Sequence, residues 1–334
     1  MNKNNFQQKQ PNNPVAFPET NHSPLTILHS LKRKVAFTLT EVLISIGIIG
    51  IVATITMPTV INTVKDRQYK VAREKALSSI GNASKNIAIQ GKMNDATNTD
   101  AFVRNILSSQ LKIVKICDNK HLYNCGISEK IKTFNGEEIS MPIYAHKTGQ
   151  AGTEGGINAV TDGNWDSRGI VTADGFSYNL FYYPKCYGNK LTTEAYFINA
   201  VHYACVNAIY DMNGLRGPNQ VGKDIGFVTV FYPNETVQAV APIARELSGS
   251  YMNLAQCQEM CAKKNYRMPN VEEGISLSLN SLLLFNRAFQ NGSIWTTSTT
   301  HAYGSLRYRI VLFYTTTLYQ REHYDKADYN LCVE

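Results

Sequence analysis

A run of 23 residues without a charged side chain, residues 42–64, constrains this chain more than any other feature. At a rise of about 1.5 Å per residue, a helix of this length measures roughly 35 Å, enough to cross a hydrocarbon core of about 30 Å. The basic cluster Lys32-Arg33-Lys34 precedes the run. Because positive charge favours the cytoplasmic side, we expect the N-terminus inside the cell and the chain beyond residue 65 outside.

Composition narrows the class of protein further. With 43% hydrophobic residues, the 334-residue chain can bury a substantial core, so it is not wholly disordered. The formal net charge is +7, but the first 36 residues hold five Lys or Arg against one Glu, and the remainder is close to neutral. No later stripe of basic and aromatic residues appears. We therefore expect no nucleic-acid partner.

The cysteines all follow the apolar run. None of them shows the paired C-x-x-C spacing of a zinc site, so disulfides are favoured over a metal centre and no cofactor is expected. Disulfides persist in oxidising compartments, which agrees with export of this part of the chain. The count is odd, so one thiol is left free or pairs between chains. The seven candidates are Cys117, Cys125, Cys186, Cys205, Cys257, Cys261 and Cys332.

Two ordinary explanations of the apolar run fit poorly. A secretory signal peptide has a shorter apolar region that ends at an A-x-A site, and neither feature is present. A simple membrane anchor does not explain Glu41, because an ionised carboxylate at the edge of an apolar helix is unfavourable without a partner.

The sequence Ala36, Phe37-Thr38-Leu39-Thr40-Glu41, followed by the apolar run, resembles the N-terminus of type IV prepilins and pseudopilins. In that family a prepilin peptidase removes a basic leader and methylates the new N-terminal Phe. The resemblance implies a cleaved leader over 1–36 and a membrane and filament-core helix over 37–64. It departs from the family pattern at Ala36, where Gly is usual.

Assembly residues follow from the same resemblance. Cleavage would create an amino group at Phe37, and Glu41 of a neighbouring subunit would pair with it in the filament, where a low dielectric strengthens the attraction. Pro58 matches a proline that loosens the first helix of many pilins.

Beyond the membrane segment, the pattern predicts an α+β fold. Apolar residues at intervals of three and four indicate one helical face over 65–90, at Tyr69, Ala72, Ala76, Ile80, Ala83 and Ile87. From about residue 96 to 250, short β-rich runs such as 177–183 and 227–232 alternate with turns. We expect a pilin-like region over 65–250 in which the helix packs on an antiparallel sheet.

The segment from Asp211 to Asp224 alternates carboxylate and amide side chains with glycines. Asp211, Asn213 and Asp224 are weak calcium candidates, because Ca²⁺ prefers oxygen ligands, but the bidentate Glu of an EF-hand is missing. Asn, Gly and Pro also form such turns on conformational grounds. We favour the turn.

Residues 251–334 resemble a C-type lectin-like domain of the bacterial kind. The resemblance lies in a Cys-bearing helix, the segment Tyr266 to Glu273, a second apolar helix over 275–289, the strand that begins Trp295-Thr296-Thr297-Ser298, and a terminal Cys. It implies a disulfide between Cys261 and Cys332, with Cys257 as a competitor. Met268, Asn270 and Thr296-Thr297 depart from the family pattern.

Residues 301–330 are dense in Tyr, His and Arg, which suit recognition on a rigid sheet. The binding candidates are Trp295, Tyr308, Arg309 and Tyr314. An ordinary amphipathic sheet explains the same alternation.

Together these features predict a minor subunit of a type IV pilus-like filament that presents its C-terminal region for adhesion. The alternative is a pseudopilin of a type II-like secretion system. No catalytic spacing stands out, so an enzyme is not expected. The implied partners are prepilin peptidase, other pilin subunits, the inner membrane before assembly and an extracellular ligand.

Overall fold

The computed structural model describes residues 38–141, 144–146, 157–159, 167–183, 197–199, 204–232, 236–248, 252–280, 283–284, 293–302, 305–312, 317–321 and 330–334. The chain divides into two compact units, Met1–Met57 and Pro58–Glu334. We describe each unit by itself.

Helix α1, Leu39–Ile89, contributes residues to both units. In the second unit, the predicted apolar face is confirmed, because Ala72, Ala76, Ile80, Ala83 and Ile87 are buried and Tyr69 is half-buried. Three of these five buried side chains are methyl groups. Small side chains let the helix backbone approach the sheet on which it packs.

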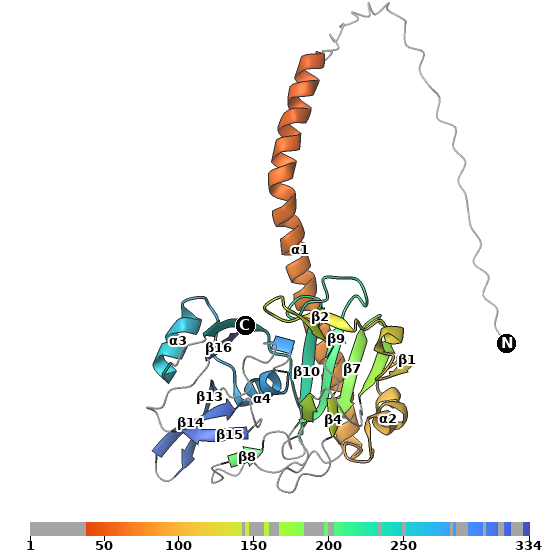
Figure 1. Ribbon diagram of the computed structural model, residues 1–334, viewed down its shortest axis with the longest axis vertical. Helices are drawn as coiled ribbons and strands as arrows, with labels where there is room; N and C mark the ends of the chain where they lie inside the picture. Colours follow the sequence, from red (N-terminus) through yellow and green to blue (C-terminus); the bar gives the residue numbers. More distant parts are fainter. Residues whose placement is uncertain are drawn as a thin grey trace, which may run out of the picture. The chain divides into compact units, whose positions relative to one another are not determined.

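The sheet against α1 has six antiparallel strands in the order β1-β6-β7-β9-β10-β11 (Figure 1). The long helix and antiparallel sheet confirm the predicted α+β, pilin-like fold class. The predicted runs at 177–183 and 227–232 correspond to β7 and β10. The strands are β1 Ile113–Asp118, β6 Arg168–Thr172, β7 Ser177–Tyr182, β9 Ala204–Asp211, β10 Ile225–Phe231 and β11 Gln238–Val240.

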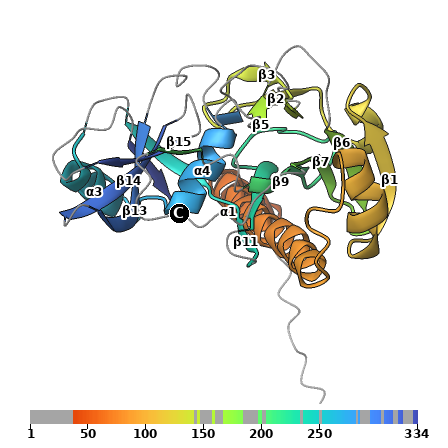
Figure 2. The same ribbon diagram turned by 90° about the horizontal axis from the view of Figure 1, so that it is seen from below.

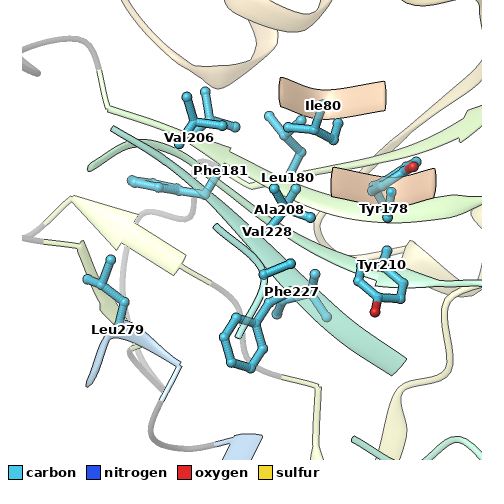
Figure 3. Packing of buried hydrophobic residues seen from close by; sticks show 14 of the residues in the cluster. Ile80, Tyr178, Leu180, Phe181, Val206, Ala208, Tyr210, Phe227, Val228 and Leu279 are labelled. Carbon is cyan, nitrogen blue, oxygen red and sulfur yellow. The ribbon is translucent and has the colours of Figure 1, made fainter. Parts of the chain in front are cut away.

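The central strands are buried on both faces. Every residue of β7 and β9 is buried, so neither strand shows the alternation of a half-exposed strand. Leu180, Ala208 and Val228 lie side by side across the strands and on the same face as Ile80 of α1 (Figure 3). The intervening residues point to the opposite face, because successive side chains alternate in direction along a strand.

Helix α4, Val271–Leu279, covers that opposite face and lies between the six-stranded sheet and a second, four-stranded sheet (Figure 2). The sequence predicted a helix over 275–289. In the structure α4 begins earlier, at Val271, because Asn270 and Glu273 form a reciprocal capping box. Residues 281–282 and 285–292 lie outside the described part of the chain.

Four buried side chains join α4 to the sheet. Asn207 of β9 and Asn280, the C-cap of α4, exchange two amide hydrogen bonds of 3.0 and 3.1 Å. Thr229 of β10 donates to Asn207 Oδ1 at 2.9 Å, and its hydroxyl lies 2.7 Å from that of Ser276. The network fixes where α4 sits, because buried polar groups are satisfied in few arrangements.

A second cluster of buried side chains forms beyond α4, consisting of Leu254, Cys257, Cys261, Met268, Trp295 and Cys332. Helix α3, Leu254–Ala262, supplies three of them. The four-stranded sheet has the order β13-β14-β15-β8, with β13 Ser293–Ala302, β14 Ser305–Leu312, β15 Thr317–Arg321 and β8 Phe197–Asn199.

Two strand pairings cross the boundary predicted near residue 250. Strand β8 pairs with β15, and β12, Ala244–Ser248, pairs with β16, Asn330–Val333. Strands from before and after residue 250 therefore take part in the same two sheets.

Short elements complete the fold. Helix α2, Thr99–Ala101, runs into a π-helical turn, Phe102–Ile106, and a 3₁₀ turn, Leu107–Ser109, and a further 3₁₀ turn spans Leu122–Cys125. The ring of Phe102 stacks on Tyr182 at 4.2 Å, which holds this region against β7. Two hairpins pair β2 Lys130–Lys132 with β3 Glu138–Ser140, and β4 Tyr144–His146 with β5 Ile157–Ala159.

Candidate functional site

The start of α1 is closed by a reciprocal cap between Thr38 and Glu41. Glu41 Oε2 accepts hydrogen bonds from Thr38 N and Thr38 Oγ1, both at 2.9 Å, and Thr38 Oγ1 accepts from Glu41 N at 3.2 Å. This capping box satisfies backbone groups that the first helical turn leaves open. Ala36 and Phe37, the predicted processing residues, lie outside the described residues.

The apolar surface of α1 in the first unit is uncovered. All large apolar side chains between Leu39 and Met57 are exposed, with fractions between 42 and 77%. The helix is long and apolar enough to cross a membrane, as judged by length and composition. An apolar surface this continuous is stable only where lipid or other protein covers it.

Hydroxyl groups within this segment are satisfied by the helix itself. Ser45, Thr54 and Thr56 donate to the backbone oxygens of Glu41, Ile51 and Val52. Such internal bonds let hydroxyls reside in an apolar environment. The Glu41 carboxylate differs from these hydroxyl groups, because its negative charge is not neutralised by the hydrogen bonds from Thr38.

Pro58 lies inside α1, at the first residue of the second unit. Its ring nitrogen has no hydrogen to donate, so one backbone bond of the helix is missing at this position. The division of the chain into two units falls immediately before it.

Among the described residues, five cysteines are disulfide-bonded and one is a free thiol. Cys117 is bonded to Cys125, and Cys261 to Cys332, which is the long-range pair that the lectin-like resemblance implies. Cys205 is also disulfide-bonded, while Cys186 lies outside the described residues. Cys257, a disulfide candidate from the sequence, is a buried free thiol instead. Burial raises its pKa to about 12, so it is poorly reactive.

The predicted binding residues do not form a described surface. Trp295 is only 1% exposed, and its indole Nε1 donates to Met252 O at 3.1 Å. Its interpretation as a binding residue is corrected: the ring fills the second buried cluster. Tyr308 and Arg309 lie in β14, but their side chains and all of Tyr314 lie outside the described residues.

The weak calcium candidates come together in the loop between β9 and β10. Asp211 Oδ1 accepts from Asn213 N and Gly214 N at 3.1 and 2.9 Å. Both oxygens of Asp224 accept from the backbone nitrogens of Asn219 and Gln220, each at 2.9 Å. Burial, reinforced by the nearby Asp224, raises the pKa of Asp211 to about 7 although two backbone hydrogen bonds oppose the shift. No group of three or more His, Cys, Asp or Glu side chains placed to hold a metal occurs in the part of the chain that the structure describes.

Sequence reasoning missed Asn219 among these loop residues. Its backbone is left-handed, with φ of 50°, and its side-chain Oδ1 is buried without a hydrogen-bond partner. The signal was its place in the Gly217-Pro218-Asn219 turn, which we interpreted as conformational.

Comparison with known proteins identifies one match. Residues 32–57 match the model of the prokaryotic N-terminal methylation motif. No curated protein and no solved structure matches the chain. The matched residues contain the basic cluster, the cap at Glu41 and the exposed apolar helix. They support a type IV pilin-like protein, pilin or pseudopilin, that is processed by prepilin peptidase and assembles with other pilins.

Proposed function

We propose that this protein is a minor subunit of a type IV pilus-like filament, cleaved between Ala36 and Phe37, and that it displays its C-terminal part for adhesion. The observation that carries the proposal is the methylation motif at residues 32–57 on a helix whose apolar side chains are uncovered. A structural subunit fits this motif better than an enzyme does.

Glu41 is the residue on which assembly depends in this proposal. In the isolated chain its carboxylate is held by Thr38 of the same helix. In a filament, the methylated amine of a neighbour's Phe37 would offer the compensating positive charge that the apolar surroundings demand. The local cap would keep Glu41 oriented until that amine arrives.

In this proposal, the N-terminus lies in the cytoplasm and the disulfide-bonded part lies outside the cell. The basic cluster before the apolar helix favours this orientation, and the Cys117–Cys125 and Cys261–Cys332 disulfides fit an oxidising compartment.

Display by the C-terminal part is supported by its own buried cluster and by the Cys261–Cys332 cross-link. The cross-link joins α3 to β16, and a chain part that is held rigid in this way presents side chains at low entropic cost, which favours binding. A pseudopilin remains the second candidate, because the motif is common to both classes.

The first experiment measures processing and assembly. We expect the intact mass of membrane-extracted protein to correspond to residues 37–334 with a methylated Phe37.

Glu41→Gln preserves side-chain shape but removes the charge, so the variant is expected to insert normally into the membrane and to be absent from sheared filaments. The neighbouring Thr40→Ala serves as the matched control and should assemble. Normal amounts of Glu41→Gln in sheared filaments would rule out the charge pairing.

The second experiment separates adhesion from assembly. Tyr308→Ala and Arg309→Ala are better than deletion of residues 251–334, because a deletion would remove the strand partners of β8 and β12. We expect weaker surface attachment with unchanged filament content. Unchanged attachment in both variants would contradict an adhesive role for this surface, and a secretion defect without filaments would favour the pseudopilin.

A further inference from the structure

Three buried oxygen atoms without partners occur within nine residues of the β9–β10 loop. They are Asp211 Oδ2, Asn213 Oδ1 and Asn219 Oδ1. Asp211 as a whole is 1% exposed. A buried oxygen that accepts no hydrogen bond is unfavourable by about 1–3 kcal/mol, and more when it is charged, so three in one loop require an explanation.

Hydrogen bonds within the loop connect the turns that carry these three side chains. Asn213 N donates to Asp211 Oδ1, and Asn213 Nδ2 donates to Gly217 O at 3.4 Å. At the other end, Met212 N donates to Asp224 O at 3.1 Å, and Asp224 Oδ2 accepts from Asn219 N. The loop therefore closes on itself, with Asp211, Asn213 and Asn219 on the connected turns.

Rearranged hydrogen bonds do not satisfy the oxygens of Asn213 and Asp211. Exchanging the amide oxygen and nitrogen of Asn213 would lose the bond to Gly217 O and leave a donor in its place. Asp211 already uses Oδ1, and its second oxygen accepts nothing. Neither Asp211 nor Asp224 forms an ion pair with a Lys, Arg or His among the described residues. Within the described part of the chain, these two buried carboxylates thus lack a cationic partner.

We propose that this loop binds a divalent cation of the Ca²⁺ type through Asp211 Oδ2, Asn213 Oδ1 and Asn219 Oδ1. Asp224 is a positioning residue, because both of its oxygens are used to hold the backbone of Asn219 and Gln220. Hard cations prefer carboxylate and amide oxygens, and Ca²⁺ accepts the irregular geometry of a loop and completes its shell with backbone carbonyls and water. Mg²⁺ demands stricter octahedral geometry, and Zn²⁺ prefers nitrogen and sulfur.

The test uses the full chain in detergent micelles, stripped with EDTA, and does not depend on filament assembly. Thermal unfolding is followed by circular dichroism with and without excess CaCl₂ or MgCl₂. Saturating Ca²⁺ is expected to raise Tm by about 5 °C, and Mg²⁺ by much less. Asp211→Asn should abolish the shift, whereas Asp118→Asn, an exposed turn carboxylate, should retain it.

A second variant keeps the proposal testable if Asp211→Asn does not fold. Asn213→Asp adds a charge to the ligand set, so it should lower the Ca²⁺ concentration at half-maximal shift and reduce Tm in EDTA. An unchanged Tm of the wild-type protein in excess Ca²⁺ would overturn the proposal. An undiminished shift in Asp211→Asn, or an unaltered midpoint in Asn213→Asp, would also overturn it, because the cation would then bind elsewhere.

Discussion

Removing the Asn207 amide is expected to destabilise the second unit strongly. Asn207→Ala deletes three buried hydrogen bonds, two with Asn280 and one with Thr229. At about 1 kcal/mol each they account for about 3 kcal/mol, and the vacated volume and the disrupted Asn280 amide add to this. We expect the free energy of unfolding to fall by about 3–5 kcal/mol.

A double-mutant cycle tests whether these side chains act as one network. Asn280→Ala removes the same two bonds with Asn207, so the double variant should lose less than the sum of the single losses, by about 1–2 kcal/mol. Urea unfolding of the full chain in detergent, followed by far-UV circular dichroism and by Trp fluorescence, measures each variant.

Asn82→Ala is the matched control, because Asn82 is exposed and makes one side-chain bond to Ser78. It should change stability by less than about 0.5 kcal/mol. A loss below about 1 kcal/mol in Asn207→Ala, or strict additivity in the cycle, would refute the view that this network fixes α4 to the sheet.

Three further predictions follow from other contacts. Cys332→Ser opens a loop with a sequence separation of 71 residues and should cost about 4 kcal/mol in urea unfolding, whereas Cys257→Ser, which removes no cross-link, should cost less. Burial raises the pKa of the Cys257 thiol to about 12, so mass spectrometry should find it unalkylated by iodoacetamide near pH 8 until urea unfolds the chain; rapid labelling of the folded protein would contradict its burial. A Cβ at Gly226 would overlap the ring of Tyr210 directly across the strand pair, so Gly226→Ala should lower the free energy of unfolding by about 1–3 kcal/mol. A Cβ at Gly81 would lie 3.2 Å from Ala239 Cβ, so Gly81→Ala should lower it by less in the same urea unfolding assay.

The amino-acid sequence alone predicted those features that depend on neighbours along the chain. The membrane segment follows from a charge-free run and a preceding basic cluster, and the processing motif is contiguous with both. The buried face of α1 follows from helical periodicity, since Ala76 and Ile80 lie one turn apart whatever they pack against. The start of α4 could also have been predicted from the sequence, because Asn270 and Glu273 have the spacing of a capping box. The helix was instead predicted to begin at residue 275, from its apolar pattern.

Only the tertiary structure decided the roles of residues whose partners are distant in sequence. Trp295 was a binding candidate from the sequence, yet it is buried in a cluster with residues of α3 and the Cys261–Cys332 cross-link. Asn207 meets Asn280 across 73 residues, and β8 joins β15 of the C-terminal sheet. Asp211 was a weak calcium candidate from the sequence, and the structure adds that its Oδ2 is buried and unpaired. Burial and hydrogen-bond satisfaction depend on every element that surrounds a group, and periodicity and spacing do not contain that information.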